Sequence, residues 1–582
     1  MTTTSNRRKP LGELRSQRWF ASEDIRGFAH RQRTQQMGMN REEFMGKPVI
    51  GIINTWSDAS PCHAHLRDRA EAVKRGVWQA GGYPIELPAL SVGEVMVKPT
   101  TMLYRNFLAM ETEELLRSHP IDGCVMLGGC DKSTPGLLMG AISMNIPAIY
   151  CPAGPMSNGR WRGHLTGAGT HTKRYWNDLQ TGKISKDDWI DLESRMTRSN
   201  GTCNTMGTAT TMTSIADAMG LCLTGASSIP AADSGHPRMA AACGMRAVEM
   251  VWEDLKPSDI LTKASIHNAL VTYMALGGSS NAAIHLIAVA RRAGLALTLD
   301  DMDDMAAKIP VLVNLFPSGR HLMEDFYFAG GLPALLHKLE PHLDGSAMTV
   351  EGRTIGEAVQ GSECFDDDII RDPDNPVVPL EAGRTLVLLR GNLAPQGAIM
   401  KTSAADPDKL RHRGPALVFD SPADMAARIH DPDLDITKDT VLVLRNSGPV
   451  GGPGMPEWGN LPIPKKLLEQ GVTDLVRISD GRMSGTHYGT CVLHVAPESA
   501  IGGPLALIRT GDFILLDALA GRLDVELSDQ ELADRRQGWT RPPSPYTRSF
   551  TALYQRHVSQ AHEGCDFDFL EGTDPVPEPS IY

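Results

Sequence analysis

The sequence predicts an α/β protein of two domains, because the pattern of apolar runs and turns changes once along the chain. Between about residues 48 and 149, short apolar runs alternate with helical stretches, as in parallel strands joined by helices. Beyond an acidic, proline-rich connection at 362–384, short β-branched runs alternate with glycine-rich turns, which is typical of a barrel-like core. We therefore expect an N-terminal α/β domain at residues 1–375, with a largely parallel sheet flanked by helices. A C-terminal β-barrel-like domain with flanking helices is expected at 376–582.

The individual elements follow from periodicity and from glycine or proline breaks. The expected N-terminal strands are short apolar runs at residues 47–54, 84–90 and 123–127. The expected helices are one opened by residues 60–65 and ended at Gly81 and Gly82, one at 136–145, a hairpin at 182–196, one within 202–220, and a largely helical segment at 258–294. The expected C-terminal strands lie at 385–389, 416–419, 440–444, 474–478 and 513–516. The tail from residue 541 is expected on the surface of this subunit or of a neighbour.

Composition narrows the possible functions. The 57 basic and 69 acidic residues give a net charge of −12, and no basic cluster is interleaved with aromatic residues, so nucleic acid is not an expected partner. Residues 1–20 lack the apolar core of a secretion signal, and no apolar run is long enough to span a membrane. These features predict a soluble cytoplasmic protein that has no membrane partner.

The ten cysteines favour reduced thiols or metal ligation over a disulfide framework, because the chain is long and carries no secretion signal. No C-x-x-C pair occurs, so a cluster would have to draw its ligands from distant loops. A phosphate-binding G-x-x-x-x-G-K-[ST] loop is missing, and so is a G-x-G-x-x-G motif after a strand. A nucleotide-dependent oxidoreductase therefore has little support.

Three successive strand-to-helix junctions carry side chains that can bind metals. Cys62 follows the first expected strand, Glu94 the second, and Cys130, Asp131 and Lys132 the third. Because crossovers between parallel strands are right-handed, these junctions share one edge of the sheet and can meet in one crevice. Thiolates suit iron–sulfur, copper or zinc, and carboxylates suit magnesium, so the mixture predicts two adjacent metal centres. A single cysteine is more often buried filler, and the coincidence of three junctions is what favours a site.

Seven motifs occur in order along the chain. They are SPCHAH (60–65), GGCDKSTPG (128–136), GTCNTMGTA (201–209), GGSSNAAIH (277–285), GNLAPQGAIMK (391–401), GPVGGPGMPE (448–457) and SDGRMSGTHYGT (479–490). Together they resemble the dihydroxy-acid and sugar-acid dehydratase family, often called the IlvD/Edd family, over about residues 14–569. LRSQRWF at 14–20 and RMSGTHYG at 482–489 are most similar to its pentonate branch, the L-arabinonate and D-xylonate dehydratases. The resemblance implies a hydro-lyase that forms a homo-oligomer, either a dimer or a tetramer.

In the family that this chain resembles, three cysteines hold an iron–sulfur cluster and leave one iron open to substrate. The matching positions are Cys62, Cys130 and Cys203. Likeness to the pentonate branch implies a [2Fe–2S] cluster, with [4Fe–4S] as the alternative. Thiolates suit iron, and a missing fourth protein ligand leaves a Lewis-acidic position for a leaving hydroxyl. The other seven cysteines fit core or surface filler better.

The resemblance also implies a magnesium ion held by carboxylates and by a lysine that carbon dioxide has carbamylated. The matching positions are Glu94, Asp131, Lys132 and Glu457. A free lysine cannot ligate a cation, whereas a carbamate supplies an oxygen donor. From the residues alone, Lys132 is equally well explained as a counter-ion for Asp131. The alternative interpretation of Glu457 is that it ends a simple glycine-rich turn.

By the same resemblance Ser484 is the base that removes the C2 proton as an alkoxide. Ser484 and Thr486 are the expected substrate-binding residues, with Thr486 bound to substrate hydroxyls. An ordinary serine cannot act as such a base, so the pKa of its hydroxyl must be lowered by strong positive charge nearby. A role in holding the loop explains Arg482 at least as well as a catalytic role does. Three histidines (His63, His65 and His487) are expected to be solvated or to support the ligands from behind, because an H-x-H pair in a loop seldom ligates.

The resemblance implies dehydration of a 2,3-dihydroxy carboxylate, a sugar acid such as a pentonate, to a 2-keto-3-deoxy acid. Two alternatives within the family are a dihydroxy-acid dehydratase of branched-chain amino-acid synthesis, whose substrate end is apolar, and a promiscuous enzyme that accepts both classes. A cluster-bearing sensor protein is a rival of another class. Such a sensor would keep the cysteines but would not need Glu94, Glu457 and Ser484 together.

Overall fold

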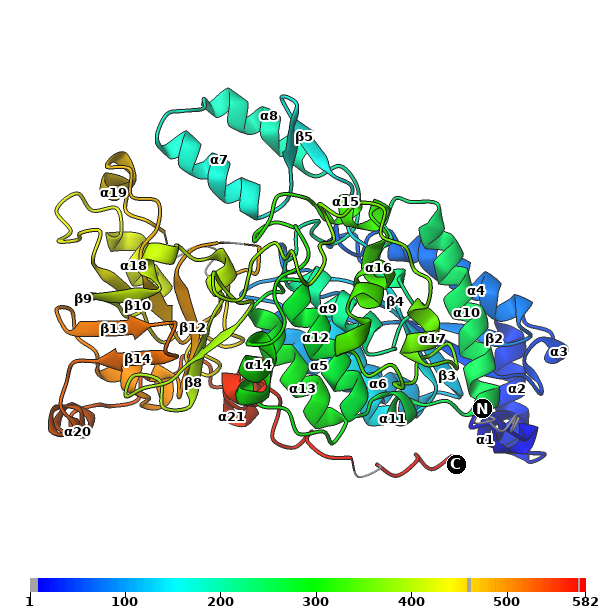
Figure 1. Cartoon of the computed structure of the whole chain (residues 1–582). Helices are drawn as coiled ribbons and strands as arrows, with labels where there is room; N and C mark the ends of the chain where they lie inside the picture. The colour runs from blue at the N-terminus through cyan, green and yellow to red at the C-terminus, as the bar shows by residue number, and fades with distance from the viewer. Residues whose placement is uncertain (1–8, 458–461, 487, 574–575, 582) are drawn as a thin grey trace.

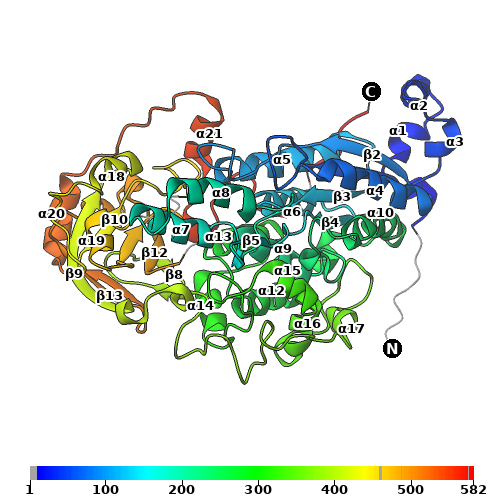
Figure 2. The same cartoon turned by 90° about the horizontal axis from the view of Figure 1, so that it is seen from above.

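The computed structural model describes residues 9–457, 462–486, 488–573 and 576–581. Two sheets of different build lie at opposite ends of an elongated molecule, with most of the helices around the N-terminal sheet (Figures 1 and 2). The predicted fold class is confirmed, since the first sheet is parallel and covered by helices and the second is a nearly closed barrel. Among the described residues, no helix is both long and apolar enough to cross a membrane.

The N-terminal sheet has four parallel strands in the order β2-β1-β3-β4. They are β1 (Val49–Asn54), β2 (Tyr83–Pro88), β3 (Gly123–Gly128) and β4 (Ala148–Pro152). Strands β1, β3 and β4 are buried along their whole length, because helices cover both faces of a parallel sheet, and so their sequences are nearly continuous apolar runs. The three strands predicted before residue 128 are confirmed to within about two residues.

Two pairs of helices sandwich this sheet, α4 (Leu66–Gln79) with α10 (Gly235–Glu253) on one face and α5 (Met102–Ser118) with α6 (Ser133–Met144) on the other. Glycines allow each pair to pack backbone against backbone. A Cβ at Gly76 would lie 1.9 Å from the carbonyl oxygen of Ala241, and one at Gly140 would lie 2.4 Å from that of Ala109. Either replacement would therefore force the two helices apart.

The remaining helices extend from both sheets. They are α1 (Gln17–Phe20), α2 (Ile25–Gln36), α3 (Arg41–Phe44), α7 (Thr170–Gln180), α8 (Lys186–Met196), α9 (Thr208–Ala218), α11 (Pro257–Ile260), α12 (Lys263–Ala275), α13 (Asn281–Arg292), α14 (Leu299–Ala306), α15 (Met323–Phe328), α16 (Gly331–Lys338), α17 (Ile355–Val359), α18 (Pro422–Arg428), α19 (Lys465–Glu469), α20 (Asp529–Gln537) and α21 (Ser549–His557). A small hairpin, β5 (Gly159–Trp161) with β6 (His164–Thr166), leads into α7.

A topological switch point lies between β1 and β3. These two strands are neighbours, yet the crossover from β1 runs outward to β2 and that from β3 runs outward to β4 on the other side. In open α/β sheets the crevice beyond the carboxyl ends of such a pair is where ligands bind. Cys62 follows β1 and Cys130 follows β3, so both lie at this crevice.

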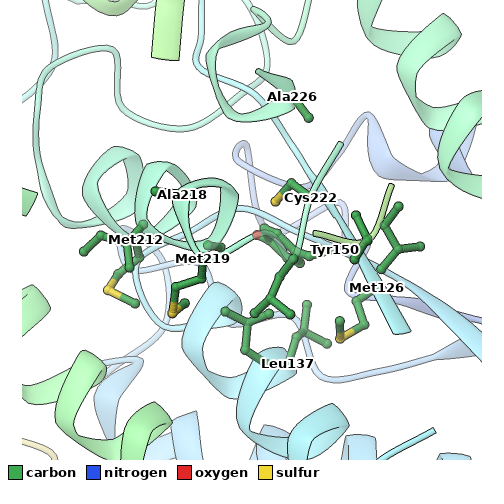
Figure 3. Close-up of a cluster of buried hydrophobic side chains, with 14 of the residues drawn as sticks. Met126, Leu137, Tyr150, Met212, Ala218, Met219, Cys222 and Ala226 are labelled. Atoms are coloured by element: carbon green, nitrogen blue, oxygen red, sulfur yellow. The ribbon is translucent and has the colours of Figure 1, made fainter. Parts of the chain in front are cut away.

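The packing beneath this crevice centres on Tyr150 of β4, which Figure 3 shows among the apolar side chains of Met126, Leu137 and their neighbours. The Tyr150 hydroxyl donates to the carbonyl oxygen of Gly128 at 2.7 Å and lies 2.8 Å from Oγ1 of Thr134. It therefore ties the end of β3 to the first turn of α6 and fixes the loop between them.

The C-terminal sheet has eight strands in the order β14-β13-β9-β10-β11-β12-β8-β7, with parallel pairing from β9 to β12 and antiparallel pairing outside. They are β7 (Val387–Leu389), β8 (Gly397–Met400), β9 (Arg411–Phe419), β10 (Val441–Leu444), β11 (Arg477–Ser479), β12 (Cys491–Ala496), β13 (Phe513–Asp517) and β14 (Arg522–Val525). A single bridge between Arg390 and Arg522 joins the two edges and nearly closes the barrel.

Several boundaries differ from those that the sequence predicts. The helical hairpin expected at 182–196 begins earlier, because its first helix is α7 at Thr170–Gln180. Strands β8, β12 and β14 were not predicted from the sequence. The connection at 362–384 has no helix, as expected, but isolated bridges tie it to Val311 and Val313. The boundary between 375 and 376 falls within it and stays a prediction.

The tail beyond residue 541 is less superficial than expected. After α21 it turns back against α5 and α13 of the N-terminal region (Figure 1). Asp566 is fully buried and pairs with the buried Arg292 at 2.6 Å, while Arg105 donates to the carbonyl oxygens of Gly564 and Cys565 at 2.9 and 2.8 Å. The end of the C-terminal region is thus anchored to the N-terminal region by buried contacts.

Candidate active site

Three carboxylates converge where the carboxyl edges of the two sheets face one another. Ligand oxygens of Glu94, Asp131 and Glu457 lie within 4.8 Å of one another. Glu94 follows β2, Asp131 follows β3, and Glu457 ends the loop after β10, so three strand ends of both sheets supply the set. The Lys132 ammonium group lies 2.9 Å from Glu94, 3.1 Å from Asp131 and 3.0 Å from Glu457. The four predicted residues therefore form one cluster, in which Lys132 is buried and the three carboxylates are half-buried.

Charges within this cluster shift the pKa of its members in opposite directions. Burial and the neighbouring Glu457 and Glu94 raise the pKa of Asp131 to about 6, in spite of Lys132. Burial would also raise the pKa of Glu94, but the charges of Lys132 and Arg482 outweigh it and lower that pKa to about 2. Burial would lower the pKa of Lys132, yet the three carboxylates raise it. An unmodified Lys132 is thus a protonated counter-ion.

The three predicted cysteines lie beside the carboxylates. Cys62 and Cys130 are buried and Cys203 is half-buried. The hydrogen bond between the Cys62 and Cys130 thiols, together with burial and the nearby Cys203, raises the pKa of Cys62 well above its usual range. The backbone N–H of Glu94 points at Sγ of Cys130, 3.4 Å away. The sulfur set and the oxygen set therefore share the loop of Cys130 and Asp131.

The spacing of the sulfurs bears on what they can hold. We compared the possible metal-ligating atoms of histidine, cysteine, aspartate and glutamate. Among the described residues, only the three carboxylates place three of these atoms within 4.8 Å of one another. The cysteine sulfurs therefore do not all converge on the position of a single ion. A cluster distributes its thiolates over more than one iron, so this wider spacing suits a cluster better than one zinc ion.

The predicted base lies on the loop between β11 and β12. Ser484 is half-buried, and its Oγ is 2.9 Å from Oγ1 of Thr486. Glycines let this loop approach its neighbours closely, since a Cβ at Gly485 would lie 2.1 Å from Oγ of Ser279, and one at Gly207 would lie 2.7 Å from Cγ2 of Thr486. Within the described part of the chain, no hydrogen bond joins Ser484 directly to the carboxylates.

Asn281, at the start of α13, connects the serine loop to the carboxylates. Its amide nitrogen donates to Oε1 of Glu457 at 2.9 Å and to the carbonyl oxygen of Met483 at 3.0 Å. Arg482 adds a second connection, since it lies 2.8 Å from Glu457 and donates to the carbonyl oxygen of Met455 at 3.0 Å. These are the contacts of a residue that holds the loop. Asn281 lies inside the motif GGSSNAAIH, but nothing local in the sequence indicated its role.

Two further carboxylates, which the sequence analysis missed, accept hydrogen bonds from the glycine-rich loop that ends at Glu457. Asp480 accepts from the backbone of Ser447 at 2.9 Å, and Glu498 accepts from Val450 at 2.9 Å and from Gly451 at 2.8 Å. All of these acceptors are buried. Burial and the charge of Asp480 raise the pKa of Glu498 to about 7. Asp480 and Glu498 therefore fix the glycine-rich loop that ends at Glu457.

The histidines next to Cys62 support the site without pointing at a ligand position. His63 accepts from the backbone N–H of Cys130 at 3.1 Å and contacts Ser91 at 2.9 Å, and burial lowers its pKa to about 3. His65 bonds to the carbonyl oxygen of Ala153 at 2.7 Å, and burial lowers its pKa to about 4. His487 lies outside the described residues. The seven other cysteines lie in or against hydrophobic clusters: Cys124, Cys151, Cys222, Cys243, Cys364, Cys491 and Cys565.

Comparison with known proteins supplies the family. The model of the dihydroxy-acid/6-phosphogluconate dehydratase N-terminal domain matches residues 47–358, and the model of the C-terminal domain matches 368–565. The chain belongs to this dehydratase family. Dehydratases eliminate water, so the protein is a hydro-lyase, and the resemblance inferred from its motifs is confirmed.

Several similar proteins of this family are named as dehydratases of sugar acids. The chain is 67% identical over 578 residues to a 6-deoxy-6-sulfo-D-gluconate dehydratase of Pseudomonas putida, with 99% of this chain and 100% of the relative covered. It is 47% identical to an L-arabinonate dehydratase of Rhizobium leguminosarum bv. trifolii, with 96% of each covered. It is 39% identical to a D-xylonate dehydratase of Caulobacter vibrioides, with 96% and 95% covered.

Proposed function

We propose that this enzyme dehydrates a 2,3-dihydroxy sugar acid to the 2-keto-3-deoxy acid. The observation that carries this proposal is the convergence, at the facing edges of two sheets, of a thiol set, a carboxylate set and the Ser484 loop. In the reaction the C2–H and C3–O bonds break, and the C2 proton and the C3 hydroxyl leave as water. The resulting enol takes a proton at C3 and becomes the ketone, so no oxidant is required.

Two inorganic groups fit the donor sets. Cys62, Cys130 and Cys203 would hold an iron–sulfur cluster, for which we favour [2Fe–2S] over [4Fe–4S]. Glu94, Asp131 and Glu457 would hold Mg²⁺, which prefers oxygen donors, and a carbamylated Lys132 would add another. When bound, such groups supply Lewis acidity at the substrate's hydroxyl and carboxylate oxygens.

The chain's own residues would then position the substrate and move its proton. Ser484 takes the C2 proton, which requires its hydroxyl to ionise in a positively charged neighbourhood. Thr486, whose hydroxyl is 2.9 Å from that of Ser484, lies beside the base and would bind the substrate's hydroxyl groups. Asn281 and Arg482 keep the serine loop in register with Glu457 through their contacts of 2.8 to 3.0 Å.

Among sugar acids, 6-deoxy-6-sulfo-D-gluconate is the first candidate substrate, because the relative that acts on it is 67% identical over nearly the whole chain. Pentonates come second, on the strength of the likeness to an L-arabinonate dehydratase. A branched-chain dihydroxy acid needs an apolar pocket for its far end, and a sensor protein would not need the base and the carboxylates together. A promiscuous enzyme is the remaining alternative.

A substrate panel tests the proposal. Enzyme purified without oxygen is incubated with 6-deoxy-6-sulfo-D-gluconate, D-gluconate, L-arabinonate, D-xylonate and 2,3-dihydroxyisovalerate, and keto-acid formation is measured. We expect turnover of at least one sugar acid and a much lower kcat/KM for dihydroxyisovalerate. If dihydroxyisovalerate alone is dehydrated, the branched-chain alternative replaces the proposal, and if no compound is dehydrated the proposal fails.

Removal of the hard metal should abolish turnover and leave the iron in place. Glu94, Asp131 and Glu457 offer only oxygen donors, which suit magnesium and contribute little to iron–sulfur binding. Treatment with EDTA, followed by measurement of activity and iron content, checks this expectation. Activity should return when Mg²⁺ is added back, and full activity of the chelated enzyme would remove magnesium from the proposal.

A further inference from the structure

A cavity of about 240 Å³ lies beside the serine loop, where α7 of the N-terminal region faces the segment around α19. Both views place α7 over the border between the two regions (Figures 1 and 2). One face of α7 contributes Lys173, Asn177 and Gln180, and the opposite wall contributes His430 and Lys465. No carboxylate belongs to the described lining of this cavity. Its polar groups are therefore cations, potential cations and amides, as in a site for an anion.

Lys173 is the unusual member of this lining. The residue is 7% exposed, its Nζ donates to the carbonyl oxygen of Tyr488 at 3.2 Å, and the same nitrogen lies 4.6 Å from the centre of the Tyr488 ring. In the described chain no carboxylate forms an ion pair with it. Burial and the nearby Arg477 lower the pKa of Lys173 to about 7. A buried cation without an anionic partner is costly, so this position is poised for a negatively charged ligand.

The cavity also lies within reach of the catalytic groups. The hydroxyl of Thr170, at the start of α7, donates to the carbonyl oxygen of Thr486, and a Cβ at Gly169 would lie 2.0 Å from Oγ1 of Thr486. Tyr488 follows Thr486 by two residues, which is a span of at most about 7 Å. The contacts of Ser484 with Thr486 and of Lys173 with Tyr488 therefore place the cavity next to the catalytic loop, where it can receive the end of the substrate that lies away from C2.

We propose that Lys173, with the cavity that it lines, binds the anionic group at C6 of the substrate, a tetrahedral sulfonate or phosphate. This inference rests on the proposed function and goes beyond it by naming the residue that binds the C6 end of the sugar acid. Sulfonate is the better fit, because one uncompensated ammonium group balances one negative charge. Lys465 is a weaker contributor, since its side chain is 55% exposed and lies 3.8 Å from Glu469.

Lys401 is the competing position. It is also a lysine without a carboxylate partner among the described residues, and burial lowers its pKa to about 7. Its ammonium group donates to the carbonyl oxygen of Gly277, and it follows β8, whose loop receives a hydrogen bond from Gly489. However, Lys401 lines none of the cavities described for the chain. Lys173 is therefore the position that we assign.

The test compares substrates that differ only at C6. We measure kcat/KM for 6-deoxy-6-sulfo-D-gluconate, 6-phospho-D-gluconate and D-gluconate with the wild-type enzyme and with K173M. The wild-type enzyme should prefer the sulfonate to gluconate, and K173M should reduce that ratio by about 30-fold or more, mainly through KM. K183M is the matched control, because Lys183 lies just beyond α7 with its side chain 71% exposed. It should keep the wild-type ratio.

The outcomes separate the two proposals. If the wild-type enzyme dehydrates no sugar acid, the proposed function fails. If it dehydrates sugar acids but does not prefer a C6 anion, or if K173M keeps the preference, only the role of Lys173 is overturned. Loss of the preference in K401M but not in K173M overturns it as well. A higher preference for the phosphate than for the sulfonate would identify phosphate as the C6 group.

A second measurement covers the case in which K173M does not fold. Inorganic sulfate should compete with the sulfonate substrate of the wild-type enzyme, raising its KM several-fold with no change in kcat. Sodium chloride at equal ionic strength is the control for screening. Equal effects of the two salts would contradict a specific oxyanion site.

Discussion

A Cys130→Ser variant should purify without its iron and sulfide and without dehydratase activity. Cys130 is buried, its thiol contacts that of Cys62, and its neighbour Asp131 belongs to the carboxylate set. A serine hydroxyl is a much poorer ligand for iron than a thiolate, and the seven cysteines outside the predicted set lie in or against hydrophobic clusters. Iron and acid-labile sulfide analysis, with the visible spectrum of anaerobically purified protein, measures the effect.

The matched control for this prediction is Cys124→Ala. Cys124 lies six residues earlier, on β3, and it is also fully buried, but it packs within the hydrophobic core, where burial raises its pKa to about 12. Its replacement should cost some stability, because it removes buried atoms, and should leave the iron content unchanged. If Cys130→Ser retained full iron, or if Cys124→Ala lost as much, the assignment of the cluster ligands would be wrong.

The part of the site that could be predicted from the sequence is the part that strand ends define. Cys62, Glu94 and Cys130 each follow an apolar run, and the handedness of crossovers brings such junctions to one edge. The structure confirms that edge and shows that β1 and β3 form its switch point. No periodicity could show that Glu457 would meet Lys132, because 325 residues separate them and they belong to different sheets. The family resemblance supplied that pairing.

The side chains that support the site without belonging to it could not be predicted either, because their contacts are also made between distant parts of the sequence. Asn281, Asp480 and Glu498 look like ordinary polar residues in the sequence, and their roles depend on backbone groups that only the folded chain brings near. The hairpin was placed too late because α7 starts directly after Gly169, which has a positive φ of 81° and offers no capping side chain.

Replacing Ser484 by alanine should lower kcat by about 10⁴ and leave the fold and metal content unchanged. Ser484 is half-buried in a glycine-flanked loop, and its hydroxyl is hydrogen-bonded only within its own loop, to Thr486, among the described residues. Its removal therefore costs little packing, whereas the proposed reaction loses the group that takes the C2 proton. Ser403→Ala is the matched control. Ser403 is likewise half-buried, in the 3-10 helix Thr402–Ala404, and its hydroxyl is hydrogen-bonded only to that of Ser318, at 3.3 Å, within the described chain.

Turnover alone would not separate loss of the base from loss of substrate binding, so exchange of the substrate's C2 proton with deuterated solvent should be measured beside it. If Ser484 is the base, Ser484→Ala should lose exchange and turnover together, while KM changes little and Ser403→Ala behaves like the wild-type enzyme. A variant that exchanged or turned over within tenfold of the parent enzyme would show that another group takes the proton. An uncarbamylated Lys132 would then be the next candidate, but its ammonium group is engaged by three carboxylates that raise its pKa. A protonated amine in that setting is a poor base, which is the physical reason for assigning the proton to Ser484.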